Sequence, residues 1–139
     1  MTVFEAMCHC GDVHFRVEHD FEHEGTRRCN CSYCKKVRAW FAIVPACRFT
    51  LLRGANAMTD YRWTPPARRA PFSHHMFCAT CGSGTYGWAD HPDMGRFYAV
   101  NVALIEGLDL GGLADLPITY VDGWNDNFAT PPADIRSLI

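Results

Sequence analysis

The sequence predicts an all-β or β-rich fold built from short antiparallel strands. Short runs rich in β-branched and aromatic residues recur along the 139-residue chain, and Gly, Pro, Asn and Asp separate them. Helical periodicity is almost absent, and the runs lack the helical spacing that βαβ units require. A chain of this length can bury a core, so we expect one domain over residues 1–139.

The first two strand candidates lie at residues 3–7 and 12–17. The first alternates loosely between apolar and polar residues. The second alternates strictly and places Val13, Phe15 and Val17 on one face. We therefore expect these three side chains in the core.

The next candidates are a bulky apolar run at residues 39–44 and a run at residues 48–52. Pro45 ends the first run, because proline cannot donate a hydrogen bond to a sheet. Residues 53–56 contain Gly54 and Asn56, which favour a turn.

Further strands are expected at residues 58–63, 70–77, 85–88 and 97–102, with a break at Pro65 and Pro66. Short helical turns are predicted near residues 102–106 and 113–116. Residues 122–139 are rich in Gly, Asn and Pro, which predicts a loop or a strap across the domain.

Composition indicates a soluble globular protein, with 48% hydrophobic and 20% charged residues. The net charge of −2 lacks the basic excess typical of nucleic-acid binding, so we expect no nucleic-acid partner. No apolar run is long enough to span a membrane. The first six residues lack the features of a signal peptide, and we expect a cytoplasmic protein.

Seven of the eight cysteines fall into three groups. These groups are Cys8-His9-Cys10, Cys29-Asn30-Cys31-Ser32-Tyr33-Cys34 and Cys78-Ala79-Thr80-Cys81, and only Cys47 stands apart. Disulfides are disfavoured without a secretion signal. Spacings of this kind are typical of zinc ligands, although iron can also occupy a four-sulfur site.

Counting ligands suggests two sites of different kinds. Cys8, Cys10, Cys78 and Cys81 make a complete four-cysteine set, which is typical of a structural zinc. The remaining triplet supplies three ligands and leaves one position open, as catalytic zinc sites do. A histidine or Cys47 remains an alternative fourth ligand for the triplet.

Several histidines, the isolated Cys47 and a group of basic residues lie near the cysteine groups in the sequence. His74 and His75 point to opposite faces of a strand, so at most one faces the triplet. We expect His9 to face solvent or to support the ligands beside it, and Cys47 to be buried and inert. Five basic residues flank the triplet and suggest a rim that attracts an anionic thiol: Arg27, Arg28, Lys35, Lys36 and Arg38.

Together the three cysteine groups resemble those of the glutathione-dependent formaldehyde-activating family, whose domain is shared with centromere-protein-V-like proteins. The resemblance covers residues 4–102 and is most specific in the triplet. It implies a small β-tent fold with two zinc sites. By this resemblance Cys8, Cys10, Cys78 and Cys81 hold the structural zinc, and Cys29, Cys31 and Cys34 hold the catalytic zinc, which we expect to be labile or empty.

The family's activity is that of a carbon–sulfur lyase. Its synthetic direction joins glutathione to formaldehyde and gives S-(hydroxymethyl)glutathione. The resemblance therefore implies an enzyme that acts on a thiol–aldehyde adduct, with a small thiol such as glutathione as partner. The alternative is a non-catalytic zinc-binding interaction module, as the centromere-protein-V-like relatives suggest.

Overall fold

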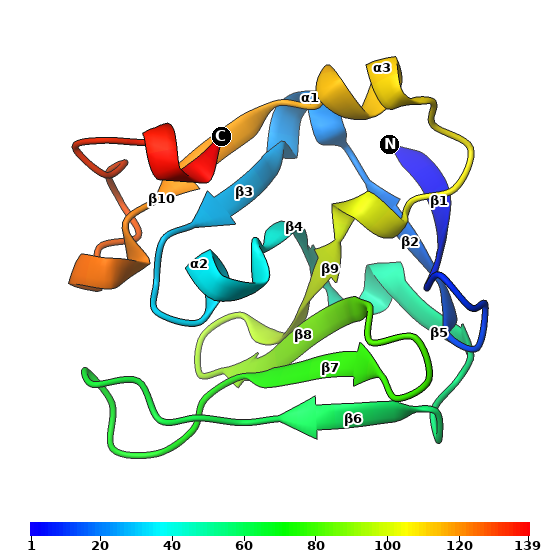
Figure 1. Ribbon diagram of the computed structural model, residues 1–139, viewed down its shortest axis with the longest axis horizontal. Helices are drawn as coiled ribbons and strands as arrows, with labels where there is room; N and C mark the ends of the chain where they lie inside the picture. The colour runs from blue at the N-terminus through cyan, green and yellow to red at the C-terminus, as the bar shows by residue number, and fades with distance from the viewer.

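Ten strands in two sheets form the protein, and they confirm the β-rich fold (Figure 1). The computed structural model describes all residues, 1–139. The strands are β1 (Thr2–Met7), β2 (His14–His19), β3 (Thr26–Cys29), β4 (Trp40–Pro45), β5 (Phe49–Arg53), β6 (Met58–Tyr61), β7 (His74–Cys78), β8 (Gly84–His91), β9 (Gly95–Asn101) and β10 (Ile118–Val121).

Helices are few and short. They are α1 (Phe21–Glu24), α2 (Cys34–Val37), α3 (Leu110–Ala114) and the 3-10 turns η1 (Ala46–Arg48), η2 (Val102–Leu104), η3 (Gly123–Asn125) and η4 (Arg136–Leu138). None of these helices has the length and apolar character needed to cross a membrane.

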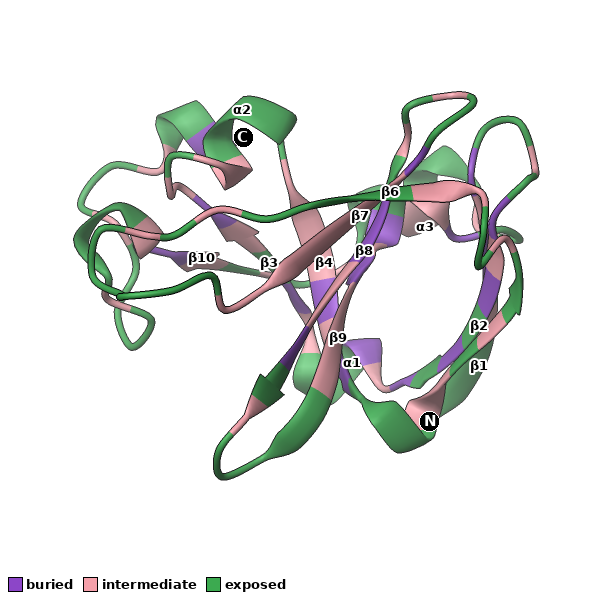
Figure 2. Cartoon of the chain, turned by 90° about the horizontal axis from the view of Figure 1, so that it is seen from below, coloured by how far each residue is buried: buried purple, intermediate pink, exposed green.

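The smaller sheet has the order β1-β2-β5, and the larger has the order β10-β3-β4-β9-β8-β7-β6. Figure 2 shows β1 and β2 across from the middle strands of the larger sheet. The core lies between the two sheets, because its buried residues come from both, with Phe15 and Val17 on one side and Val44 and Val100 on the other.

The alternation in β2 has the predicted consequence. Val13 and Phe15 are fully buried and Val17 is 1% exposed. On the opposite face of the same sheet, Arg16 pairs with Glu5 of β1. The strict pattern thus determines which face of β2 covers the core.

Two strands were missed by the sequence analysis, β3 and β10. They pair in parallel, so the expectation of purely antiparallel strands is wrong at this edge. Both strands have only four residues, too few for alternation to identify them. Residues after Val121 form the tail (residues 122–139), which Figure 1 shows beside β3 and α2.

Candidate metal centres

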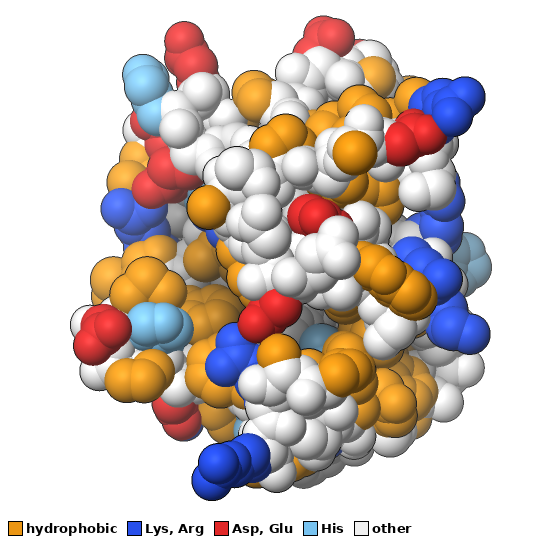
Figure 3. Space-filling view, turned by 90° about the vertical axis from the view of Figure 1, so that its left-hand side faces the viewer, with side chains coloured by type: hydrophobic (Ala, Val, Ile, Leu, Met, Phe, Trp, Pro, Cys, Tyr) orange, Lys and Arg blue, Asp and Glu red, His pale blue; other side chains and the backbone are white.

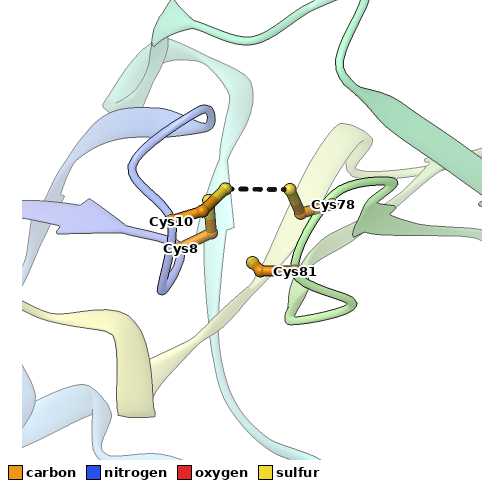
Figure 4. A group of neighbouring side chains, drawn as sticks. All are labelled: Cys8, Cys10, Cys78 and Cys81. Carbon is orange, nitrogen blue, oxygen red and sulfur yellow. Dashed lines mark hydrogen bonds between the residues drawn. The ribbon is translucent and has the colours of Figure 1, made fainter.

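The first candidate centre, here the closed cluster, consists of Cys8, Cys10, Cys78 and Cys81. Their four sulfurs lie within 4.8 Å of one another. Figure 4 shows the four side chains converging from two separate turns. The Sγ atoms of Cys8 and Cys10 are 3.7 Å apart, and those of Cys10 and Cys78 are 3.6 Å apart.

These spacings fit a tetrahedral zinc ion. A Zn–S bond near 2.3 Å and tetrahedral angles place neighbouring sulfurs ~3.8 Å apart. A disulfide would bring two sulfurs to ~2.05 Å, and all eight cysteines are free thiols. The closed cluster therefore has the donor atoms and the spacing that a metal ion needs.

Two tight turns present these sulfurs. Gly11 follows the first pair and Gly82 follows the second, and both have positive φ values, +85° and +76°. Each glycine N–H donates to the carbonyl of the first cysteine of its turn, Cys8 or Cys78, at 3.0 and 2.9 Å. Glycine adopts this left-handed conformation without steric cost, so it lets the chain reverse directly behind the ligands.

The closed cluster also connects the two sheets. Its first turn joins β1 to β2 in the smaller sheet, and its second joins β7 to β8 in the larger one. A hydrogen bond of 3.0 Å from Thr80 Oγ1 to Asp12 Oδ2 links the same two turns. A metal ion at this position would hold together elements about seventy residues apart in sequence.

The second candidate centre is the triplet, Cys29, Cys31 and Cys34. Its sulfurs also lie within 4.8 Å of one another. Cys29 ends β3 and Cys34 begins α2, so the chain turns sharply between them. Backbone N–H groups of Cys31 and Cys34 donate to the sulfurs of Cys29 and Cys31, at 3.4 and 3.3 Å. Such donors favour the thiolate form that metal binding requires.

The three thiols strongly affect one another. Hydrogen bonds with Cys29 and Cys34 lower the pKa of Cys31 to about 2. The pKa of Cys34 is raised, first by its contact with Cys29 and then by that with Cys31. One thiolate is thus favoured at the expense of its neighbours, and a cation would relieve the repulsion between several thiolates.

No fourth protein ligand joins the triplet. The group of potential ligand atoms contains the three cysteines and no histidine, aspartate or glutamate. Cys47 belongs to η1, and it is exposed, so the expectation that it is buried is wrong. The triplet therefore offers three protein ligands and no fourth one.

One wall of the triplet is aromatic. The rings of Tyr33 and His75 have centroids 4.1 Å apart, and the Tyr33 ring stacks on that of Tyr61 at 5.7 Å. Burial lowers the pKa of His75. His74 instead stacks on Trp88, with centroids 3.7 Å apart, and contacts Asp60. Neighbouring side chains of a strand point to opposite faces of the sheet, so His75 lies in this wall and His74 points away from it.

The tail also contacts the triplet and forms a second wall. A Cβ atom built on Gly123 would lie 2.5 Å from Cys29 Sγ and 3.0 Å from Cys31 Cβ. Asn30, between two of the ligands, donates to Asp122 Oδ1 at 3.0 Å and accepts from the Trp124 N–H at 2.9 Å. The tail is therefore hydrogen-bonded to the side chain of Asn30, which lies in the turn of the triplet.

Basic side chains surround this part of the site, but the predicted rim is only partly realised. Arg28, Lys35 and Arg38 line a small cavity beside Cys29 and Cys34. Arg27 and Lys36 are exposed and line neither this cavity nor the depression next to it. His9, as expected, is exposed beside its ligand neighbours.

Sequence reasoning missed the contribution of Asn30 and Gly123. Asn30 entered the sequence analysis only as the residue between Cys29 and Cys31, and Gly123 only as part of a segment rich in Gly, Asn and Pro. The pairing of β10 with β3 brings Val121 opposite Cys29 and so delivers the tail to the triplet. That pairing joins segments about ninety residues apart, so no pattern within either segment predicts it.

The chain is similar in sequence and in structure to proteins of a known family. A family model described as glutathione-dependent formaldehyde-activating enzyme matches residues 3–112. The chain is also similar to a Rhodobacter sphaeroides protein of known crystal structure, with 32% sequence identity and a TM-score of 0.64. This similarity covers 83% of the present chain and 99% of the other. The family match includes both cysteine clusters and ends before β10 and the tail.

Proposed function

Because the chain belongs to the family of glutathione-dependent formaldehyde-activating enzymes, we propose that it is a zinc-dependent carbon–sulfur lyase. Its substrate would be the adduct of a small thiol, such as glutathione, with an aldehyde, such as formaldehyde. In the synthetic direction the thiol sulfur bonds to the carbonyl carbon, and the thiol proton passes to the carbonyl oxygen. In the reverse direction the carbon–sulfur bond breaks and the proton returns to sulfur.

The observation that carries this proposal is the difference between the two clusters. The closed cluster has four sulfurs, whereas the triplet has three. A tetrahedral zinc ion held by the triplet would have one position left for a substrate atom. Cys8, Cys10, Cys78 and Cys81 would hold a structural zinc, and Cys29, Cys31 and Cys34 would hold the second. A zinc ion at the triplet would supply Lewis acidity and would favour the thiolate form of a bound thiol.

The walls of the triplet would orient the substrate. The half-buried rings of Tyr33 and His75 give one side an aromatic surface that limits the access of water. Lys35 and Arg38 give the neighbouring side a positive charge that attracts an anionic thiol. The protein would thus hold the reacting sulfur and carbon close together. Most of the rate acceleration would come from this proximity.

Variants of single ligands test the proposal. The exchange between glutathione and its hydroxymethyl adduct is followed by NMR in a formaldehyde solution, with the uncatalysed rate subtracted. We expect the Cys31→Ser and Cys34→Ser variants to lose the second zinc and the acceleration, and to keep a cooperative unfolding transition. Cys8→Ser is the control for the closed cluster and should lose the folded structure itself, because structural zinc contributes directly to folding.

Two results would contradict the proposal. If Cys31→Ser unfolds as readily as Cys8→Ser, the triplet is a structural site as well. If the wild-type protein holds two zinc ions and gives no acceleration with any thiol, it is a zinc-binding interaction module.

A further inference from the structure

The tail contacts the triplet at both of its ends. Asn30, between Cys29 and Cys31, is hydrogen-bonded to the start of the tail. Helix α2, which begins at Cys34, is followed by Arg38, and Arg38 is hydrogen-bonded to the end of the tail. Figure 3 looks onto this side of the molecule, where acidic, basic and hydrophobic side chains are mixed. The tail therefore contacts the segments that flank the triplet on both sides.

Three hydrogen bonds connect Asn30 with the C-terminal segment. Its backbone N–H donates to the Val121 carbonyl at 3.3 Å. Its side-chain Nδ2 donates to Asp122 Oδ1 at 3.0 Å, and its Oδ1 accepts from the Trp124 N–H at 2.9 Å. Because Asn30 lies between two cysteines of the triplet, these bonds restrain the backbone that carries both of them.

Asp122 anchors the start of the tail. It is 9% exposed, and its carboxylate also accepts from Asn125 Nδ2 at 2.8 Å. Hydrogen bonds from the side chains of Asn125 and Asn30 lower the pKa of Asp122, so it is an ionised acceptor at neutral pH. Hydrogen bonds to an ionised acceptor are stronger than those between neutral groups. The contact between Asp122 and Asn30 is therefore a firm connection between the tail and the triplet.

The far end of the tail is held beside the triplet as well. Arg38 Nη1 donates to the Ser137 carbonyl at 2.9 Å. Leu138 is 6% exposed and, together with Cys29 and Cys34, lines a small cavity. Burial of this apolar side chain favours the docked tail.

These contacts link docking of the tail to metal binding at the triplet. A metal ion needs the three sulfurs at fixed positions, although thiolates at such short distances repel one another. Residues that hold metal ligands from behind commonly strengthen metal binding, because they fix the orientation of the ligands. If the docked tail strengthens metal binding, the metal strengthens docking of the tail by the same factor.

We propose that the tail is a clasp that sets the affinity of the triplet for its metal ion, with Asn30 and Asp122 as the positioning residues. Metal binding fixes the tail, and loss of the metal releases it. This inference rests on the proposed function, because it requires a metal ion at the triplet. The tail lies beyond residue 112, where the family match ends, so the clasp belongs to the C-terminal segment of this chain.

Exchange of the two positioning side chains tests the clasp. Asn30→Asp alone places a second carboxylate against Asp122, and it should raise the Kd of the triplet for zinc about tenfold or more. The double variant Asn30→Asp/Asp122→Asn should regain most of this affinity. In that variant the amide at position 122 donates to the carboxylate at position 30, which still accepts from the Trp124 N–H.

Competition with a chromophoric zinc chelator measures the Kd of the triplet separately from that of the closed cluster. Asn127→Asp is the matched control, because it makes the same chemical change within the tail. The side chain of Asn127 bonds to Thr130 and to backbone N–H groups of the tail, and not to Asn30. This variant should keep the wild-type Kd.

Hydrogen exchange of the wild-type protein tests the reverse direction of the linkage and needs no variant. The amides of residues 122–126 should exchange more slowly in the protein with two zinc ions than in the protein from which the chelator has removed the ion of the triplet. Mass spectrometry of peptides from the tail measures this difference. A tail that only packs against the domain would exchange equally in both forms.

The other outcomes are distinct. If Asn30→Asp keeps the wild-type Kd, or if exchange in the tail does not depend on the metal, the clasp is overturned while the lyase function stands. If Asn30→Asp loses affinity and the double variant does not regain it, the loss comes from charge near the sulfurs, and the clasp is again overturned. If the wild-type triplet binds no zinc, the proposed function fails and the clasp fails with it.

Discussion

The α-carbon of Gly123 faces the sulfur of Cys29 so closely that a Cβ atom there would lie 2.5 Å away. Nothing larger than glycine fits between the tail and the triplet. This contact connects the C-terminal segment with the proposed second metal site, and it determines the first prediction.

Gly123→Ala should displace the tail from the triplet. Overpacking of this kind costs about 1–3 kcal/mol of the free energy of unfolding. Because the added methyl group contacts a ligand sulfur, we expect the metal content to fall from two ions toward one. Elemental analysis of the purified protein measures this.

Gly84→Ala is the matched control for that variant, since a Cβ atom at Gly84 meets nothing within 4 Å. It should keep both ions and nearly the wild-type melting temperature. Equal metal content in both variants would show that the tail is not a wall of the metal site.

His75→Gln should keep both metal ions, because His75 is not among the ligands of the triplet. Its ring packs against Tyr33, so the variant should lower stability by about 1 kcal/mol through lost aromatic packing. Metal analysis and thermal unfolding check the two parts separately. Loss of one ion in this variant would identify His75 as the missing fourth ligand.

Alkylation of the native protein should report the occupancy of both clusters. Cys47 is exposed and belongs to neither cluster, so iodoacetamide should add one group to the fully loaded protein. A protein with an empty triplet should accept four groups, because metal-bound thiolates are protected and free ones react. Intact-mass spectrometry counts the adducts.

Cys47→Ser is the control for the alkylation experiment and should remove the single adduct without loss of metal. A loaded protein that still reacts at Cys29, Cys31 or Cys34 would contradict the assignment of these residues as ligands.

Glu24 and Arg48 should stabilise the fold modestly. Their side chains meet at 2.9 Å, and this hydrogen bond is the main cause that lowers the pKa of Glu24. A carboxyl group with a lowered pKa stabilises the folded state above its ordinary pKa, and this contribution is lost as the pH falls through the folded-state pKa. Glu24 is 40% exposed, so a double-mutant cycle with Glu24→Gln and Arg48→Gln should give a coupling of only about 0.5 kcal/mol.

The coupling between Glu24 and Arg48 should be the same at pH 6 and pH 8, because both values lie above the carboxyl titration. Chemical denaturation at the two pH values measures it. Glu22→Gln, in the same helix and without an ion pair, is the control. A coupling that changes several-fold between these pH values would show that another group governs it.

The sequence predicted the β-rich fold and both cysteine clusters, because each of them depends on patterns within short stretches of the chain. The alternation of Val13, Phe15 and Val17 identified a half-buried strand. Short cysteine spacings identified the two turns of the closed cluster, because such turns bring sulfurs together without help from distant residues. The pairing of those turns followed from the need for four ligands.

The walls of the triplet could not be predicted in the same way. The contact of Gly123 with Cys29 depends on the parallel pairing of β10 with β3, which no local pattern encodes. The assignment of His75 rather than His74 to the aromatic wall depends on the register of β7. That residues 1–139 form one domain stays a prediction.

The most direct test of the account is the number of metal ions per chain, measured by elemental analysis before and after incubation with glutathione. We predict two zinc ions, one of which the thiol removes or exposes to a chelator, since the triplet is open and the closed cluster is complete. One tightly held ion, with no effect of the thiol, would contradict the assignment of the triplet as the functional centre.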